Sequence, residues 1–208
     1  MQNDRPRGNS RGERSRSRLL DAAEMVMSRH GYLGATIPRI VAAAGIPLSS
    51  IYHFYGSKDG LLEAVLERGG RRLNDAIPGP PPGLDKFEAA TYMVEGLCAA
   101  VDDHPHFFQL LTSIVDVAEA SPGDRGIARA RQLRELGLTL LRARIAAVFD
   151  IGVETELATT LAQFSRAAID GALLAVKVDG ASLAAMLAPL PTALVAIHAA
   201  STTAQRGS

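Results

Sequence analysis

A glycine between two short helical segments constrains this chain more than any other feature. Residues 36–44 and 47–55 repeat apolar side chains at helical spacing, and Gly45 lies between them. Gly45 follows Val41 by four residues and precedes Ile51 by six. This is the spacing of a helix-turn-helix, in which a helix crossing is followed by a tight turn and then by an apolar anchor. The pattern therefore predicts two short helices joined by a turn that requires glycine.

An amphipathic helix precedes this pair and another follows it. Apolar residues recur every three or four positions over Arg16–His30, which ends at Gly31, and again over Asp59–Ala76. In the second short helix, Ile51 and Tyr55 form a buried side. Its other faces carry small and polar side chains, as expected of a helix that approaches base edges.

Charge is divided unevenly along the chain. The 22 basic and 22 acidic residues cancel over the 208 residues. Residues 1–58 hold nine Lys or Arg and four Asp or Glu, a net charge of +5. Residues 59–208 hold the other 13 basic and 18 acidic residues, a net charge of −5. A basic end predicts contact with a polyanion, although a solvated arm of arginines would give the same count.

The stretch from Ser17 to Leu66 resembles the DNA-binding domain of the tetracycline-repressor (TetR) family of bacterial transcription regulators. The resemblance rests on the run LLDAAE, the turn AAGI and the pattern IY-x-x-Y-x-S-K-x-x-LL. It implies an all-α fold of about nine helices, with an N-terminal three-helix helix-turn-helix domain and a helical ligand-binding and dimerisation domain. The expected divisions are a basic disordered arm at 1–11, the DNA-binding domain at 12–72 and the second domain at 73–208.

The same resemblance implies a homodimer that represses transcription from a palindromic operator on double-stranded DNA and is released by a small, mostly apolar effector. The phosphate contacts that it implies are Thr36, Tyr52 and Lys58. Arg16 and Arg18, near the N-terminus, are expected to add phosphate or minor-groove contacts. The groove contacts are Ser49, Ser50 and His53, next to Pro47 and Leu48. Pro47 and Leu48 stand where the family usually has Ser or Thr and often a basic residue, so the operator sequence does not follow from the resemblance.

The remainder of the chain is predicted to be helical. After a Pro- and Gly-rich loop at 78–83, the expected helices are Asp85–Asp103, Pro105–Ala120, Gly126–Phe149, Glu154–Val178 and Ala181–Ala200. No charged residue occurs from Gly180 to Gln205, a length that could span a membrane. Because this segment is rich in alanine and interrupted by two prolines, we expect a helix buried on nearly all sides, as in a dimer, and no membrane partner.

Aromatic and polar residues of these helices are candidates for an effector pocket, although ordinary core is the simpler explanation for any one of them. The candidates are Tyr92, Met93, Cys98, Phe107, Phe108, Leu111, Phe149, Gln163, Phe164 and Arg166. Arg166 is the most informative, because an arginine in an apolar helix requires a buried acid or an anionic ligand unless it faces solvent. Small residues at near-helical spacing are candidates for a dimer interface: Ala167, Ala168, Gly171, Ala172 and Ala175.

Several kinds of chemistry find no support in the sequence. Cys98 is the single cysteine, and the polar N-terminus is not a secretory signal, so a cytoplasmic protein is expected. His104 and His106 flank Pro105, which breaks the spacing of a helical metal-binding pair. No catalytic residue, metal or cofactor is predicted. Two alternatives stay open: a helix-turn-helix regulator without a small-molecule ligand, and an all-helical enzyme.

Overall fold

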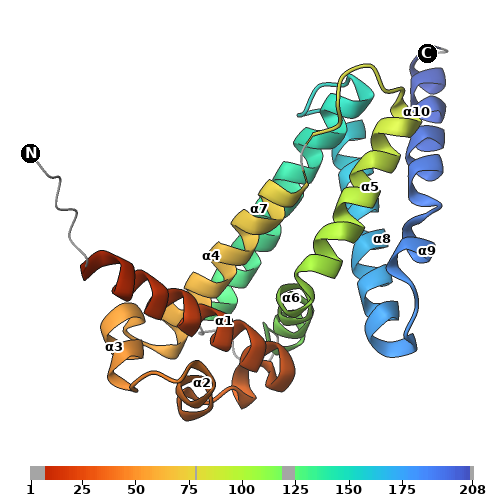
Figure 1. The fold of residues 1–208 in the computed structure, drawn as a ribbon. Coiled ribbons are helices and arrows are strands. Elements are labelled where there is room, and N and C mark those ends of the chain that lie inside the picture. The colour runs from red at the N-terminus through yellow and green to blue at the C-terminus, as the bar shows by residue number, and fades with distance from the viewer. Residues whose placement is uncertain (1–7, 78, 119–124, 207–208) are drawn as a thin grey trace, which may run out of the picture. The chain divides into compact units, whose positions relative to one another are not determined.

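The computed structural model describes residues 8–77, 79–118 and 125–206 (Figure 1). Every regular element in these residues is a helix, which confirms the expected all-α fold. The helices are α1 (Gly8–Gly34), α2 (Ile37–Ala44), α3 (Ser49–Tyr55), α4 (Lys58–Ala76), α5 (Lys86–Asp103), α6 (Pro105–Ala118), α7 (Arg125–Phe149), α8 (Glu156–Asp179), α9 (Leu183–Leu187) and α10 (Leu190–Arg206).

Helix α1 begins earlier and ends later than predicted. Residues 8–11, which were assigned to a disordered arm, are helical, and residues 1–7 lie outside the described part of the chain. No proline interrupts the segment from Gly8 onward, and its Arg and Glu residues favour helix. Gly31 has a non-helical backbone (φ 66°, ψ 167°), so the predicted end is a kink, after which the helix continues to Gly34.

The last predicted helix is divided into α9 and α10. Pro191 is the second residue of α10, a position where the missing N–H group costs little. The expectation that this segment is buried on nearly all sides is wrong for a single chain, since 28% of the apolar stretch Leu183–Thr203 is buried. The leucines of these helices are buried, whereas most of their alanines are exposed, among them Ala184 and Ala196. By length and hydropathy alone the stretch would also suit a membrane span.

Contacts divide the chain into two compact units. The first comprises Met1–Gly70 and Pro105–Arg131, and the second comprises Arg71–His104 and Gln132–Ser208. The break after Gly70 lies close to the predicted domain boundary at residue 72, but the first unit also takes in α6. The assignment of residues 73–208 to ligand binding and dimerisation stays a prediction.

In the first unit, α1 packs against α2 and α6 (Figure 1). The core of the first unit consists of fully buried apolar side chains: Leu19, Met27, Ile40, Ile51, Leu61, Leu62, Leu66 and Leu110. Helices α4 and α6 approach closely where Gly69 faces the ring of Phe107, and a Cβ on Gly69 would overlap that ring. Glycine is therefore required for this approach.

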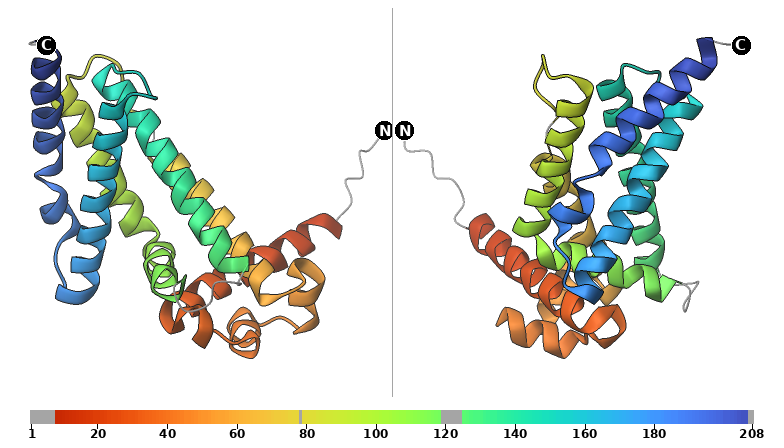
Figure 2. Two further views of the ribbon diagram at one scale, coloured as in Figure 1. Left: turned by 180° about the vertical axis from the view of Figure 1, so that it is seen from behind. Right: turned by 90° about the vertical axis from the view of Figure 1, so that its right-hand side faces the viewer.

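In the second unit, α5 and α8 both pack against α10, and the views from two further directions agree (Figure 2). Phe149 and Ile145 of α7, Leu161 of α8, and Leu187 and Leu194 of α9 and α10 share one buried cluster. The apolar faces that the helical periodicity predicts thus meet in a common core.

Candidate nucleic-acid interface

The turn between α2 and α3 has the predicted geometry. Gly45 adopts the left-handed conformation (φ 61°, ψ 39°), and its N–H donates to the carbonyl of Val41 at 2.9 Å. The Nη2 of Arg18 donates to the Ala44 carbonyl at 2.7 Å and lies 3.1 Å from where a Cβ of residue 45 would be. Arg18, which was expected to contact DNA, therefore fastens α1 to the end of α2. Sequence reasoning missed this role, because the partner is a backbone carbonyl.

Helix α3 begins two residues later than predicted. The N–H groups of Ser50 and Ile51 donate to the carbonyls of Pro47 and Leu48 at 3.0 and 3.2 Å, which forms a tight first turn. No side chain caps this helix, as expected from the loss of a hydroxyl at its start. Ile51 is fully buried and anchors the helix to the core.

The face of α3 opposite Ile51 is open to solvent. Tyr52 is 55% exposed and Leu48 is 48% exposed. Ser49 and His53 are also exposed, whereas Ser50 is half-buried. Two large side chains on a helix with a fully buried anchor are suited to contact another molecule.

Thr36 and Lys58 lie at the starts of α2 and α4. Thr36 is the exposed N-cap residue of α2, and its side chain forms no capping hydrogen bond. The Lys58 ammonium lies 4.2 Å from the centroid of the Tyr32 ring and 3.5 Å from the Leu33 carbonyl oxygen. The Tyr32 hydroxyl donates to the Asp59 carboxylate, so the start of α4 is held against the end of α1. Helix N-termini favour anions, which fits a phosphate contact at either position.

Arg16 and Tyr55 connect α3 with α1. The Arg16 guanidinium lies 5.0 Å from the centroid of the Phe54 ring, and the Tyr55 hydroxyl donates to the Arg16 carbonyl at 3.5 Å. Burial raises the pKa of Tyr55, and the charges of Arg16 and Arg68 partly oppose the shift. The Tyr55 hydroxyl is therefore protonated at neutral pH and acts as a donor.

Arg68 of α4 forms an ion pair with two acids of α1 that the sequence did not reveal. Its Nη1 lies 2.7 Å from Asp21 Oδ1 and its Nη2 lies 2.9 Å from Glu24 Oε2. Glu24 is 8% exposed, and the Arg68 guanidinium compensates the charge of its carboxylate. The spacing of Asp21 and Glu24 on one helix face was the available signal, but it does not identify a partner 44 residues away.

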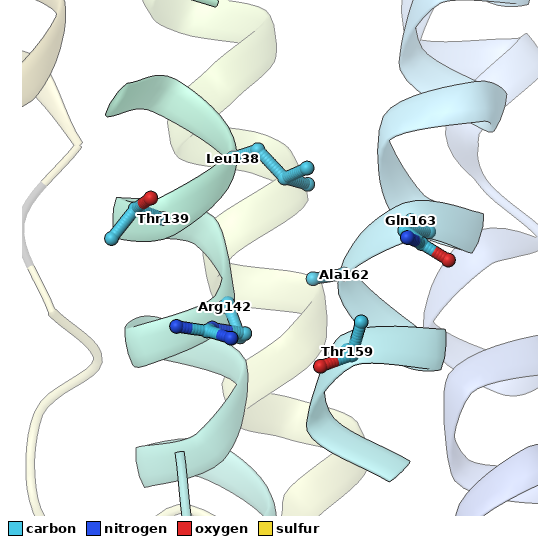
Figure 3. A pocket seen from close by; sticks show the side chains of 6 residues that line it. All are labelled: Leu138, Thr139, Arg142, Thr159, Ala162 and Gln163. Atoms are coloured by element: carbon cyan, nitrogen blue, oxygen red, sulfur yellow. The ribbon is translucent and has the colours of Figure 1, made fainter. Parts of the chain in front are cut away.

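The predicted effector-pocket residues are divided between the two units, and their role stays a prediction. Phe107, Phe108 and Leu111 belong to α6 and the first unit, and the other candidates belong to the second unit. Phe149 is 1% exposed and part of the core, whereas Phe164 is 42% exposed. A pocket of about 140 Å³ lies between α7 and α8, lined by Leu138, Thr139, Arg142, Thr159, Ala162 and Gln163 (Figure 3). Gln163 is the one residue shared by the candidate set and this pocket.

The predicted dimer residues of α8 differ in exposure. Ala167 and Gly171 are exposed, Ala168 and Ala175 are half-buried, and Ala172 lies in the core at 2% exposure. At helical spacing, three large apolar side chains extend the exposed stripe, although none of them was predicted to lie in an interface: Phe164, Leu174 and Val178.

An exposed, anchored second helix after a left-handed glycine turn defines the first unit as a helix-turn-helix domain of the kind found in transcription regulators. Comparison with known proteins then identifies the family. The profile for "Bacterial regulatory proteins, tetR family" matches residues 19–65. Residues 19–65 thus carry a domain that matches the DNA-binding domain of the TetR family of bacterial transcription regulators, a family of regulators rather than enzymes.

Individual relatives agree with this assignment. A helix-turn-helix transcriptional repressor of Streptomyces coelicolor is 31% identical over 99 residues, which cover 48% of each protein. The repressor AcnR of Corynebacterium glutamicum is 32% identical over 63 residues, 30% of this chain and 34% of AcnR. The chain thus matches about half or less of the length of these relatives.

Solved structures extend the likeness in fold to most of the chain. A TetR-family regulator from Streptomyces coelicolor superposes with a TM-score of 0.73 over 92% of this chain and 83% of its own, at 20% identity. Another from Agrobacterium tumefaciens has a TM-score of 0.71 over 88% of this chain and 97% of its own, also at 20% identity. At this identity the likeness concerns the fold alone.

Proposed function

We propose that the protein is a cytoplasmic DNA-binding repressor that acts as a homodimer on a palindromic operator and is released by a small, mostly apolar effector. The observation that supports this most directly is the exposed face of α3, where Leu48, Ser49, Tyr52 and His53 are accessible while Ile51 is fully buried. A helix held in this way enters the major groove, with the residues near its N-terminus next to base edges.

Phosphate contacts would fix the position of α3 in the groove. The Thr36 hydroxyl offers a donor, and Lys58 and Arg16 add positive charge. The net +5 of residues 1–58 attracts DNA, whereas the net −5 of the remainder is repelled by it. We therefore expect operator affinity to fall steeply as salt rises, because bound cations are released from DNA.

The open apolar stripe of α8 supports a homodimer. Phe164, Leu174 and Val178 are 42%, 58% and 68% exposed in a single chain, and the small residues Ala167 and Gly171 between them would let another helix approach closely. One recognition helix reads only a few base pairs. Two helices related by a twofold axis read half-sites about 34–36 Å apart, or a multiple of that distance, which corresponds to a palindrome.

Release by an effector requires that the ligand bind the DNA-free conformation more tightly than the DNA-bound one. A change in the distance between the two recognition helices would then lower operator affinity. A regulator without a small-molecule ligand shares the same DNA-binding domain and is the second candidate. The two differ in whether any ligand of the second unit changes operator affinity.

The proposal can be tested by selecting operators from random DNA duplexes with the full-length protein and measuring affinity by gel shift. We expect the selected sequences to be palindromic and to bind two chains. Tyr52→Ala and Lys58→Ala should each weaken binding by about tenfold or more, and Lys58→Ala should reduce the salt slope by about one. Phe87→Ala and Arg71→Gln are matched controls, because they remove an exposed aromatic ring and an exposed charge outside the helix-turn-helix.

Circular dichroism and thermal unfolding would verify that each variant is folded, which matters for Lys58 because it contacts Tyr32. Folded Tyr52 and Lys58 variants that bind like the wild type would contradict the assigned contacts. Binding that does not change with salt would contradict DNA as the partner.

A further inference from the structure

Arg166 of α8 extends across the neighbouring helix at a glycine. Its Nη2 lies 2.9 Å from the point where a Cβ of Gly137, on α7, would be. A side chain at residue 137 would therefore compete with the guanidinium for this space. Both residues belong to the second unit, and Arg166 is half-buried there rather than facing solvent.

Asp170, an acid whose charge acts on Arg166, is paired with another arginine. Asp170 Oδ2 accepts a hydrogen bond from Arg134 Nη2 at 2.7 Å. Arg166 itself forms no hydrogen bond or ion pair with any residue in the described part of the chain. Burial lowers the pKa of Arg166. The negative charge of Asp170 opposes this shift, and the positive charge of Arg134 adds to it. An arginine nevertheless keeps its charge in proteins, so the two arginines and one acid leave one positive charge uncompensated.

The pocket between α7 and α8 lies one helical turn along α8 from Arg166, which is not itself one of its lining residues. Arg166 is one helical turn from Ala162 and Gln163, and Gly137 adjoins Leu138, all three of which line the pocket (Figure 3). Leu138 and Ala162 also take part in the hydrophobic core cluster, which gives the pocket an apolar floor.

Polar groups line the rest of the pocket. Thr139 and Thr159 each donate to a carbonyl of their own helix, at 3.1 and 3.2 Å, so their oxygens can still accept a hydrogen bond. Arg142 binds Glu154 through Nη2 at 3.1 Å, while its Nε is buried without a hydrogen-bond partner in the structure. The volume of about 140 Å³ is close to that of an apolar protein cavity of roughly 150 Å³ that binds benzene.

We propose that the groove between α7 and α8 is the effector site and that it binds a small organic carboxylate. The carboxylate pairs with the Arg166 guanidinium, whose planar donors match the two carboxylate oxygens. An apolar part of about the size of a benzene ring lies against Leu138 and Ala162. This inference rests on the proposed function for its regulatory meaning, but the binding itself can be measured without DNA.

Isothermal titration calorimetry of the full-length protein with benzoate tests the site directly. Benzamide has nearly the same shape and no charge, so it is the matched ligand control. For a ligand of so few atoms we expect a benzoate Kd near about 1 mM. Benzamide should bind at least about tenfold more weakly, because it cannot form the charge-assisted pair.

Variants of Arg166 test whether its guanidinium is the group that binds the carboxylate. Arg166→Gln should weaken benzoate binding by about tenfold to a hundredfold and abolish the preference for benzoate over benzamide. Arg166→Lys should retain part of the affinity, because it keeps the charge without the planar fork. Arg71→Gln removes an exposed arginine elsewhere in the second unit and should bind benzoate like the wild type. Unfolding curves would confirm that the variants are folded.

Several results would overturn the inference. The first two are the absence of saturable benzoate binding and equal affinities for benzoate and benzamide. The others are a folded Arg166→Gln variant that binds benzoate like the wild type, and an Arg166→Gln variant that changes the oligomeric state but not benzoate binding. Operator binding is measured separately. Failure to bind DNA would refute the proposed function, whereas DNA binding without benzoate binding would refute the effector site alone.

Discussion

Replacing Gly69 by alanine should destabilise the protein, although alanine is the better helix former. Gly69 lies in α4, and a Cβ there would overlap the Cδ2 and Cε2 atoms of Phe107 in α6. The Phe107 side chain is 3% exposed, so its ring has little space into which it could move. Either the ring must leave its rotamer or the two helices must separate.

The expected magnitude follows from two opposing terms. Overpacking of a well-packed core typically costs about 1–3 kcal/mol. The change from glycine to alanine within a helix offsets up to about 1 kcal/mol of this cost. We therefore expect Gly69→Ala to lower the free energy of unfolding by about 1–2 kcal/mol.

Gly12→Ala is the matched control, because Gly12 lies in α1 and a Cβ added there would have nothing within 4 Å. It should stabilise the protein by about 0.5–1 kcal/mol. Urea unfolding followed by circular dichroism would compare the two variants. Phe107→Leu should relieve the overlap, so its combination with Gly69→Ala should be more stable than the sum of the single effects predicts. A Gly69→Ala protein as stable as Gly12→Ala would refute the close approach of α4 and α6.

Two further predictions concern charged groups. Arg68→Met should lower the free energy of unfolding by up to about 3 kcal/mol, because it removes a charge partner of the Glu24 carboxylate, which is 8% exposed. The Arg68→Met, Glu24→Met double variant should lose less in urea unfolding, and an equal or greater loss would contradict the ion pair. Burial, and then the charge of Lys86, lower the pKa of His198, so the unfolded chain takes up a proton at higher pH than the folded one. The stability that depends on neutral His198 is present above about pH 6.5 and is lost as the pH falls below that value. His198→Gln should therefore make the urea midpoint depend less on pH below about 6.5. An unchanged pH dependence would exclude His198 as the source of this loss.

Much of the fold could be predicted because it depends on local chemistry. Helical periodicity located every helix to within a few residues, apart from the two ends of α1 and the division of the last segment at its prolines. The left-handed turn at Gly45 followed from the need for a residue without a Cβ. The start of α1 was misplaced because polar, arginine-rich residues carry no apolar periodicity and yet can form helix.

The candidate site was predictable in part for a similar reason. Tyr52 and His53 are exposed on α3 because Ile51 occupies its buried face, and that division was visible in the sequence. The role of Arg18 was not, because its partner is the carbonyl of Ala44, and a backbone carbonyl leaves no mark in the sequence.

The sequence by itself thus determined the all-helical class, the helix-turn-helix and the separation of basic and acidic charge. These properties depend on residues close together in the chain. Tertiary structure alone decided that Arg68 pairs with Glu24, that the absence of a Cβ at Gly69 makes room for the Phe107 ring, and that Asp170 forms its ion pair with Arg134 rather than with Arg166. Each of these contacts joins residues on different helices. Their pairing depends on how the helices pack, which the periodicity of a single helix does not specify.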